Sequence, residues 1–345
     1  MTTNILITGA SGEIGSSLVE YFSEQGSFNI VGIDPSPAPS HIQSKCHRFI
    51  QGSILEEAPF KAASDISFDK IFHMAGILSS GCERNPVLGH QVNVQGTFNT
   101  LEFARKQSVE AGRAVMVMYP STIAVYGIPT LADKTAAGKI QEDQFLNANI
   151  LYAHSKIYAE KLGVYFTKYY QMLADKPTQK IDFRCVRFPG IWSATTLPTG
   201  GTTDYAPEMI HAAAQGHPYK CFVRPDTTLP FMTMPDALKA LIQISEVKAE
   251  RIKSRIYNVG AFSMSAEDIA TNVKRYFPNA STSYEPHLQR QSFVDMWPAD
   301  VDDSKARSEW GWEPQHGKIH AFEEYMIPAV KSRYPQTSPA TSLSR

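Results

Sequence analysis

The chain has 345 residues, enough to bury a large core in one big domain or one and a half. Its 33 Lys and Arg side chains nearly balance its 34 Asp and Glu side chains, and a formal net charge of −1 disfavours a nucleic-acid or membrane surface built on bulk charge. The four cysteines are scattered without a Cys-x-x-Cys pair, so we expect no disulfide framework, no metal site and a reducing, cytoplasmic setting. No apolar run is long enough to span a membrane, and because the first strand begins by Asn4 we expect no signal or transit peptide.

Strand and helix signals alternate through the first half of the chain. An amphipathic helix follows Gly15, and further helices are predicted over 87–106 and from Leu151 to about Tyr170. Strands are predicted over 5–8, 29–34, 46–51, 70–74, 114–119 and 181–188. Alternation of this kind implies right-handed crossovers, and therefore a Rossmann-type, doubly wound α/β fold with a parallel sheet covered on both faces.

The pattern loosens after Phe188. Helices are predicted over 205–215, 235–247, 265–276 and 319–330, with one strand over 255–259. We expect residues 1–188 to form mainly the cofactor-binding domain. Residues 189–333 are predicted to form mainly a smaller α/β substrate cap, with some segments returning to the first domain. The end of the chain, 334–345, is rich in Ser, Thr and Pro and is predicted to be disordered.

A glycine loop joins the first strand to the first helix. Its spacing is Gly9-x-x-Gly12-x-x-Gly15, and its free backbone N–H groups and the helix dipole can hold a pyrophosphate. Asp34 ends the second strand 19 residues after Gly15, where a carboxylate can accept from a ribose 2′-hydroxyl and would repel a 2′-phosphate. This favours NAD over NADP. The alternative is a glycine turn without a ligand, with Asp34 as a turn residue before Pro35.

Two further strand ends point to the same crevice. The fourth strand runs into Met74-Ala75-Gly76, whose small residues allow backbone to approach a cofactor, and Ser121 and Thr122 follow the fifth strand. Ligands of open parallel sheets bind beyond the carboxyl ends of the strands. A hydroxyl there can hydrogen-bond a substrate oxygen, although a helix-cap role for the same hydroxyl stays open.

Tyr152 and Lys156 stand four residues apart at the start of a predicted helix. Residues i and i+4 share one helix face, so the phenol and the ammonium can point into one site. A lysine charge beside a tyrosine favours the phenolate, which makes the tyrosine a usable base near neutral pH. The alternative is a surface helix with a solvated lysine.

Together and in this order, these motifs resemble the extended short-chain dehydrogenase/reductase family, which includes NAD-dependent epimerases and dehydratases. Asn93 and Arg187-Phe188-Pro189-Gly190 add to the likeness, which covers roughly residues 4–330. The resemblance implies hydride transfer with Tyr152 as acid/base, Lys156 lowering its pKa and holding the nicotinamide ribose, and Thr122, with Ser121, orienting the substrate oxygen. The NAD-binding set that it implies is Gly9, Ser11, Gly12, Glu13, Ile14, Gly15, Asp34, Ser53, Ile54, Met74, Ala75, Gly76, Asn93, Ser121, Tyr152, Lys156 and Pro189.

Blocks in the second half resemble the epimerase-type L-threonine 3-dehydrogenases within that family. The blocks are 200–206, 229–237, 302–307 and Trp310-Gly311-Trp312. The likeness implies L-threonine as a small-molecule substrate, with contacts from Ser80, Ser121, Thr122, Tyr152, Gly190, Thr203 and Trp297. The chain departs from that group at Ala153-His154 and in a longer, more charged segment between Gly127 and Leu151.

Other functions stay open at this stage. Ile123-Ala124 stands where dehydratases of the family carry an Asp-Glu pair, which disfavours dehydration. A nucleotide-sugar epimerase or reductase would need cations for a diphosphate, and Lys220, Arg224 and Arg290 are available. A non-enzymatic NAD-binding regulator would carry a broken catalytic set. Relatives commonly pair through two long helices, here 87–106 and 151–170, so the resemblance implies a homodimer.

Overall fold

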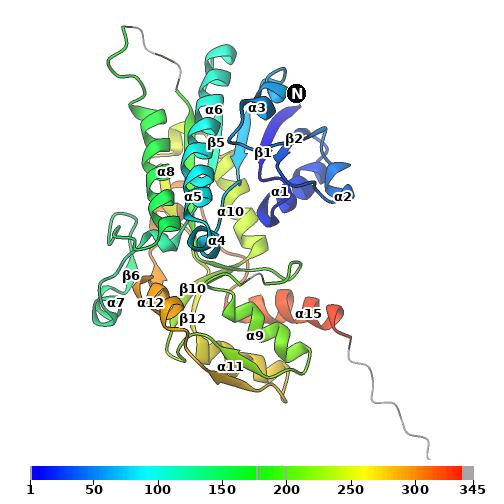
Figure 1. Cartoon of the computed structure of the whole chain (residues 1–345), viewed down its shortest axis with the longest axis vertical. Helices are drawn as coiled ribbons and strands as arrows, with labels where there is room; N and C mark the ends of the chain where they lie inside the picture. Colours follow the sequence, from blue (N-terminus) through cyan, green and yellow to red (C-terminus); the bar gives the residue numbers. More distant parts are fainter. Residues whose placement is uncertain (1, 176–177, 179, 199, 336–345) are drawn as a thin grey trace, which may run out of the picture.

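The computed structural model describes residues 2–175, 178, 180–198 and 200–335. Most of the predicted tail, from residue 336 on, lies outside the described residues. The described residues form a main sheet of seven strands, each pair of neighbours parallel (Figure 1). In spatial order the strands are β11 (Ile256–Asn258), β7 (Asp182–Phe188), β5 (Met116–Thr122), β4 (Lys70–His73), β1 (Thr3–Thr8), β2 (Phe28–Asp34) and β3 (Arg48–Gln51).

This order confirms the Rossmann-type prediction. The chain starts in the middle of the sheet at β1, runs outward through β2 and β3, and then returns to β4 on the other side. The strand order therefore reverses between β1 and β4, which is where doubly wound folds bind their ligands.

Alternate residues of each strand feed separate cores on the two faces of the sheet. Ile5 and Ile7 face one core and Leu6 the other, as the two-residue period of a strand requires. The first core is covered by α1 (Glu13–Glu24), α2 (Ser40–Gln43), α10 (Met234–Glu246) and α13 (Ser304–Trp310). The second core is covered by α3 (Glu57–Ala63), α6 (Thr97–Ala111) and α8 (Leu151–Lys168).

A third core lies at the lower end of the view in Figure 1. We call the elements that surround it the cap. Trp192, Tyr205, Phe231 and Trp297 are buried in it. Its strands are β8 (Gly190–Trp192), β10 (Thr228–Thr233), β12 (Phe262–Ser265), β9 (Tyr219–Cys221), β13 (Thr282–Tyr284), β6 (Lys139–Ile140) and β14 (Asp300–Val301). Its helices are α7 (Leu131–Ala137), α9 (Tyr205–Ala214), α11 (Ala266–Tyr276), α12 (Leu288–Met296), α14 (Lys318–His320) and α15 (Ile327–Arg333).

Local sequence explains where several helices begin and end. Thr233 caps α10 by accepting from the backbone N–H of Asp236, and a proline follows at the first turn. Ser265 and Asp268 form a capping box at the start of α11. Gly112 ends α6 in the left-handed conformation, at φ +64°.

The predicted helix 87–106 is longer and less regular than expected. It begins as α5 (Pro86–His90), passes through a π-helical turn, η1 (Gln91–Gly96), and continues as α6 to Ala111. A second π-helical turn, η4 (Ala321–Met326), interrupts the predicted final helix. Periodicity alone does not reveal a π turn, which often marks a functional position.

The predicted long segment between Gly127 and Leu151 is folded onto the cap. It contains α7 and β6, and β6 pairs with β14 from the far end of the sequence. Glu142 of this segment forms an ion pair with Lys305. Within the part of the chain that the structure describes, no helix is both long and apolar enough to cross a membrane.

Candidate active site

A pocket of about 350 Å³ opens at the carboxyl ends of the central strands. One wall comes from the glycine loop and the start of α1, a second from the ends of β5 and β7, and a third from Tyr152 and Lys156 on α8. Cap residues 201–204 and Trp297 close the remaining side. The pocket therefore lies between the two parts of the chain, at the strand ends where the sequence predicts a site.

The glycine loop leaves no space for side chains. Gly9 has φ +71°, and a Cβ atom there would lie 2.6 Å from the backbone nitrogen of Ala75. A Cβ on Gly15 would lie 2.0 Å from the carbonyl oxygen of Gly9. The helix α1 then begins at Glu13 without a side-chain cap, so its first backbone N–H groups are available to an anion. This backbone fits the pyrophosphate of NAD.

Asp34 stands at the end of β2 and is mostly buried. Its carboxylate accepts hydrogen bonds from the backbone N–H of Ser11 at 3.0 Å and of Ser36 at 2.9 Å. It therefore fixes the glycine loop in addition to any contact with a ribose, and a carboxylate retains further acceptor positions for one. Asp34 does not line the pocket itself.

The catalytic triplet predicted from the sequence is brought together. Thr122 ends β5, Tyr152 and Lys156 lie on successive turns of α8, and all three line the pocket. The hydroxyl of Thr122 lies close enough to the phenol of Tyr152 to influence its proton affinity. The ammonium of Lys156 donates to the carbonyl oxygen of Pro120 at 2.7 Å and lies 4.5 Å from the centre of the Tyr119 ring.

Burial controls the proton affinities of this pair. It raises the pKa of Tyr152 above its ordinary value, while the nearby Thr122 hydroxyl acts in the opposite direction. Burial lowers the pKa of Lys156 to about 8. The predicted lowering of the tyrosine pKa by Lys156 is not among the effects that act on the phenol, so in the chain alone Tyr152 is a phenol at neutral pH.

Ser121 does not present its hydroxyl proton to a substrate, as the sequence suggests that it would. Its hydroxyl donates to the carboxylate of Glu160 at 2.6 Å, and its side chain is 3% exposed. The single proton of that hydroxyl is therefore already used, and Thr122 is the strand-end hydroxyl that is left to face a substrate.

Asn93 lies behind the pocket wall, on the π-helical turn η1. Its side chain accepts from the backbone N–H of Ile77 at 2.8 Å and donates to the carbonyl oxygen of Ile77 at 2.9 Å. It also donates to the hydroxyl of Ser155 at 3.2 Å. Asn93 therefore holds the loop after β4 against α8, and it does not line the pocket.

The predicted residues fall into two groups. Those that line the pocket are Gly9, Gly12, Glu13, Ile14, Gly15, Met74, Gly76, Ser121, Thr122, Tyr152, Lys156, Pro189, Gly190, Thr203 and Trp297. Those that the structure places outside its lining are Ser11, Asp34, Ser53, Ile54, Ala75, Ser80 and Asn93. His154, between the two catalytic candidates, is exposed on the other side of α8.

The sequence prediction missed a contact that joins the two parts of the chain across the pocket. The hydroxyls of Ser79, on α4 (Ser79–Arg84), and Thr202 lie 3.1 Å apart, and both residues are buried in the lining. Asp204 lines the same end and accepts from the backbone N–H of Gly201 at 2.7 Å. Ser79 and Thr202 are direct neighbours of the predicted Ser80 and Thr203. The sequence blocks that predicted a substrate contact therefore lie within one residue of this pair.

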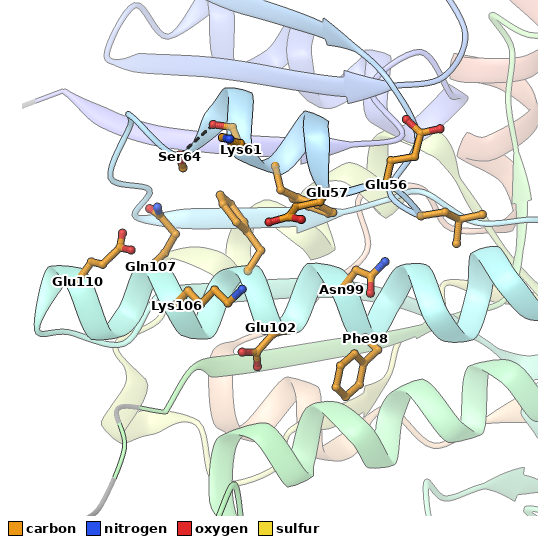
Figure 2. Close-up of a pocket in the computed structure, with 13 residues that line it drawn as sticks. Glu56, Glu57, Lys61, Ser64, Phe98, Asn99, Glu102, Lys106, Gln107 and Glu110 are labelled. Atoms are coloured by element: carbon orange, nitrogen blue, oxygen red, sulfur yellow. Dashed lines mark hydrogen bonds between the residues drawn. The ribbon is translucent and has the colours of Figure 1, made fainter.

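A second hollow, of about 410 Å³, lies between α3 and α6 (Figure 2). Glu57 and Lys61 of α3 stand across it from Glu102 and Lys106 of α6. It is larger than the first pocket, but it contains none of the predicted site residues and lies away from the strand ends. Volume alone does not identify an active site, and we assign the chemistry to the pocket around Tyr152.

Comparison with known proteins shows the family and the relatives that this chain resembles. Residues 5–260 match the NAD dependent epimerase/dehydratase family. The mitochondrial L-threonine 3-dehydrogenase of Bos taurus is 33% identical over 314 residues, which cover 90% of this chain and 78% of that protein.

Solved structures show the same similarity. A monomeric L-threonine 3-dehydrogenase from a metagenome is 31% identical with a TM-score of 0.83, over 96% of this chain and 99% of that one. The GalE-like L-threonine dehydrogenase of Cupriavidus necator, in its holo form, is 30% identical with a TM-score of 0.81, over 96% and 99% of the two chains.

Proposed function

The chain belongs to the NAD-dependent epimerase/dehydratase family, and from this premise we propose that it oxidises the Cβ hydroxyl of L-threonine to 2-amino-3-oxobutanoate. It is an NAD-dependent oxidoreductase by its family and its relatives. The choice of L-threonine as substrate, and of Tyr152 as the base, is our proposal. Relatives named for that activity at about 30% identity support the choice of substrate.

The residues that would hold NAD come from the first part of the chain. The backbone of Gly9, Gly12 and Gly15 would receive the pyrophosphate, Asp34 the adenosine ribose, and Lys156 the nicotinamide ribose. When bound, the nicotinamide supplies the chemistry of hydride acceptance. We further propose that residues 1–188 mainly bind this cofactor and that residues 189–333 mainly cap the substrate.

Tyr152 would take the proton of the substrate hydroxyl as the carbon–hydrogen bond breaks. Thr122, whose hydroxyl lies beside Tyr152, would hold the same oxygen so that its proton points to the phenolate. Lys156, whose ammonium lies 5.7 Å from the centre of the Tyr152 ring, would hold the nicotinamide ribose beside the phenol. Trp297, 3% exposed, closes the cap side and limits the entry of water.

One observation carries the choice of a small substrate: among the described residues that line the pocket, Lys156 is the only Lys or Arg. A diphosphate normally requires several cations. The substrate end is formed instead by hydroxyl groups of Ser79, Thr202 and Thr203, with the carboxylate of Asp204 beside them. Such a lining can satisfy a small zwitterion, whose charged ends must be paired when they are buried.

The runner-up function is a nucleotide-sugar epimerase or reductase of the same family. Its three candidate cations are engaged elsewhere, and none of them lines the pocket in the part of the chain that is described. Lys220 pairs with Glu285, Arg224 pairs with Asp226 and Asp295, and Arg290 stacks on Phe222.

The decisive assay mixes the purified protein with NAD and L-threonine and follows NADH absorbance. We expect turnover with L-threonine and none with a UDP-sugar. Activity on the UDP-sugar without threonine turnover would establish the epimerase or reductase function. Absence of both, with intact NADH binding, would favour the non-enzymatic regulator.

We also propose a homodimer in the cytoplasm. Exposed apolar side chains lie on α5, α6 and α8, the helices through which relatives are expected to pair: Val87, Phe98, Tyr158 and Tyr165, with Tyr169 directly after α8. A mass measurement in solution near twice 38.3 kDa would support the dimer, and one near 38.3 kDa would contradict it. Cell fractionation tests the location, since the Bos taurus relative is named as mitochondrial.

A further inference from the structure

A fully buried ion pair lies one turn beyond Lys156. The side chains of Glu160, on α8, and Arg187, on β7, are 0% and 1% exposed. The guanidinium donates to both carboxylate oxygens, at 2.8 and 2.6 Å. Buried charges are costly even when they are paired, and apolar residues can often replace such a pair without loss of stability. Stability alone therefore does not account for this buried pair.

Glu160 also belongs to a ladder of contacts between α8 and β5. The phenol of Tyr152 lies beside the Thr122 hydroxyl, Lys156 donates to the carbonyl oxygen of Pro120, and Glu160 accepts from Ser121. Three successive turns of one helix face thus bind three consecutive residues at the end of one strand. The distance between Thr122 and Tyr152 is set by how α8 and β5 are aligned, and Glu160 anchors the far end of that alignment.

We propose that Glu160 is a positioning residue for the proposed oxidation, acting through Ser121 on the placement of Thr122 against Tyr152 and through its charge on the ammonium form of Lys156. The inference rests on the proposed function. Arg187 completes the arrangement, because its guanidinium also donates to the Tyr126 hydroxyl at 2.9 Å and to the carbonyl oxygen of Glu142 at 2.7 Å. The anchor therefore reaches the segment between Gly127 and Leu151.

The charges around Lys156 support the second half of this proposal. Burial lowers the pKa of Lys156, and Glu160 acts in the opposite direction. The other groups that face Lys156 carry no negative charge near neutral pH, because burial raises the pKa of the phenols and thiols and lowers that of His73 to about 3. These groups are His73 on β4, Cys82 on α4, Tyr119 on β5, Tyr152 on α8 and Cys185 on β7.

The test compares Glu160→Gln with a matched control, Asp182→Asn. Asp182 is also a buried carboxylate bound to arginine, at the opposite end of β7, and it contacts none of the site residues. Glutamine keeps the shape of Glu160 and can still accept from Ser121, so it removes mainly the charge. Ser121→Ala removes the contact between Glu160 and β5 and leaves the charge of Glu160 in place.

The primary readout needs no substrate. In protein labelled with ¹³C at the lysine ε-carbon, the signal that is lost in Lys156→Met reports the titration of Lys156. We expect Glu160→Gln to lower the midpoint of that titration by about one pH unit or more, which is a tenfold loss of proton affinity. Asp182→Asn should leave the midpoint unchanged. An unchanged midpoint in Glu160→Gln would overturn the electrostatic half of the proposal.

The second readout is steady-state kinetics with L-threonine. We expect kcat to fall about tenfold or more in Glu160→Gln and a few-fold in Ser121→Ala, with KM changed less than about threefold in both. Asp182→Asn, at a similar loss of thermal stability, should keep its kcat. Equal kcat values in Glu160→Gln and Asp182→Asn would reduce Glu160 to a structural residue. If the wild type does not oxidise L-threonine, the proposed function fails while the lysine titration still decides the role of Glu160.

A paired variant covers the case in which Glu160→Gln does not fold. Glu160→Gln with Arg187→Met removes both charges and leaves no unpaired guanidinium. We expect this protein to fold and to keep the low Lys156 midpoint and the low kcat. Recovery of the wild-type midpoint and kcat in the double variant would overturn the proposal.

Discussion

Similar ion pairs lie at the amino and the carboxyl ends of the strands in the main sheet, but they serve different purposes. At the amino edge of β7, Asp182 binds Arg184 and Arg255, and these groups contact none of the site residues. At the carboxyl edge, Glu160 and Arg187 are buried even more completely, and their contacts extend to Ser121 and Tyr126. The same chemistry thus supports the fold at the amino ends of the strands and the site at their carboxyl ends. The difference between the two ion pairs lies in the residues that each pair contacts.

The largest contrast is expected at Tyr152. Replacing it by Phe removes the proposed base, and kcat should fall about 10²–10⁴-fold, the range of general-base catalysis. Fluorescence titration should show nearly unchanged NADH affinity. Full activity in Tyr152→Phe would show that Tyr152 is not the base. The carboxyl ends of the strands would then have no more demonstrated role in catalysis than the amino ends.

Lys156→Met should separate stability from activity. Burial lowers the pKa of Lys156 from 10.5 to about 8, so the charged lysine costs on the order of 3 kcal/mol at pH 7. The variant also loses the hydrogen bond to Pro120, and we expect its free energy of unfolding to rise by about 1–3 kcal/mol while kcat falls by about 10²-fold.

The pH dependence of stability checks the sign of this effect. Between pH 8 and 10.5 the unfolded wild type keeps the lysine proton that the folded chain releases, so wild-type stability should gain from Lys156 as pH rises through that window. Urea unfolding at pH 7 and pH 10 measures the gain. Lys156→Met should lack it, and an equal gain in both proteins would contradict the shifted pKa.

Activity should also depend on pH, and the ion pairs of Asp182 at the amino end of β7 should not affect this dependence. The base must lose a proton and Lys156 must keep one. Because burial raises the pKa of Tyr152 and lowers that of Lys156 to about 8, kcat/KM should rise about tenfold per pH unit up to about pH 8 and then level off. Asp182→Asn should reproduce this profile. A profile that is flat below pH 8 would contradict the raised pKa of Tyr152.

The smallest of these effects is expected at Asp34, which stands at the carboxyl edge of β2. The wild type should prefer NAD over NADP, because the carboxylate would repel a 2′-phosphate. Asp34→Asn should narrow that preference about tenfold while keeping an acceptor for the loop at Ser11. Initial rates with the two cofactors measure it, and a wild-type preference for NADP would show that Asp34 does not bind the ribose.

Local spacing explains what the sequence could predict. The glycine loop and the pair Tyr152–Lys156 are short-range patterns whose chemistry needs only a strand–loop–helix or one helix face, and the structure places both in one pocket. The parallel, doubly wound character of the main sheet followed from strand–helix alternation.

Long-range partners explain what it could not. The orientation of Ser121 depends on Glu160, 39 residues later, and the contact between Ser79 and Thr202 joins positions 123 residues apart. In the cap, β10 contains Pro230, a residue that argues against a strand when only the sequence is known. Such features depend on tertiary packing, which a pattern of residue types does not encode.

The ladder between α8 and β5 has a consequence for how the protein folds. Pro120 and Ser121 meet their helix partners 36 and 39 residues later, so the site forms only when a long loop has closed and the helix has docked on the sheet. Helices form far faster than such contacts. During refolding, helical circular dichroism should therefore recover before turnover does. The rate at which enzyme activity recovers then measures the rate at which α8 docks on the sheet.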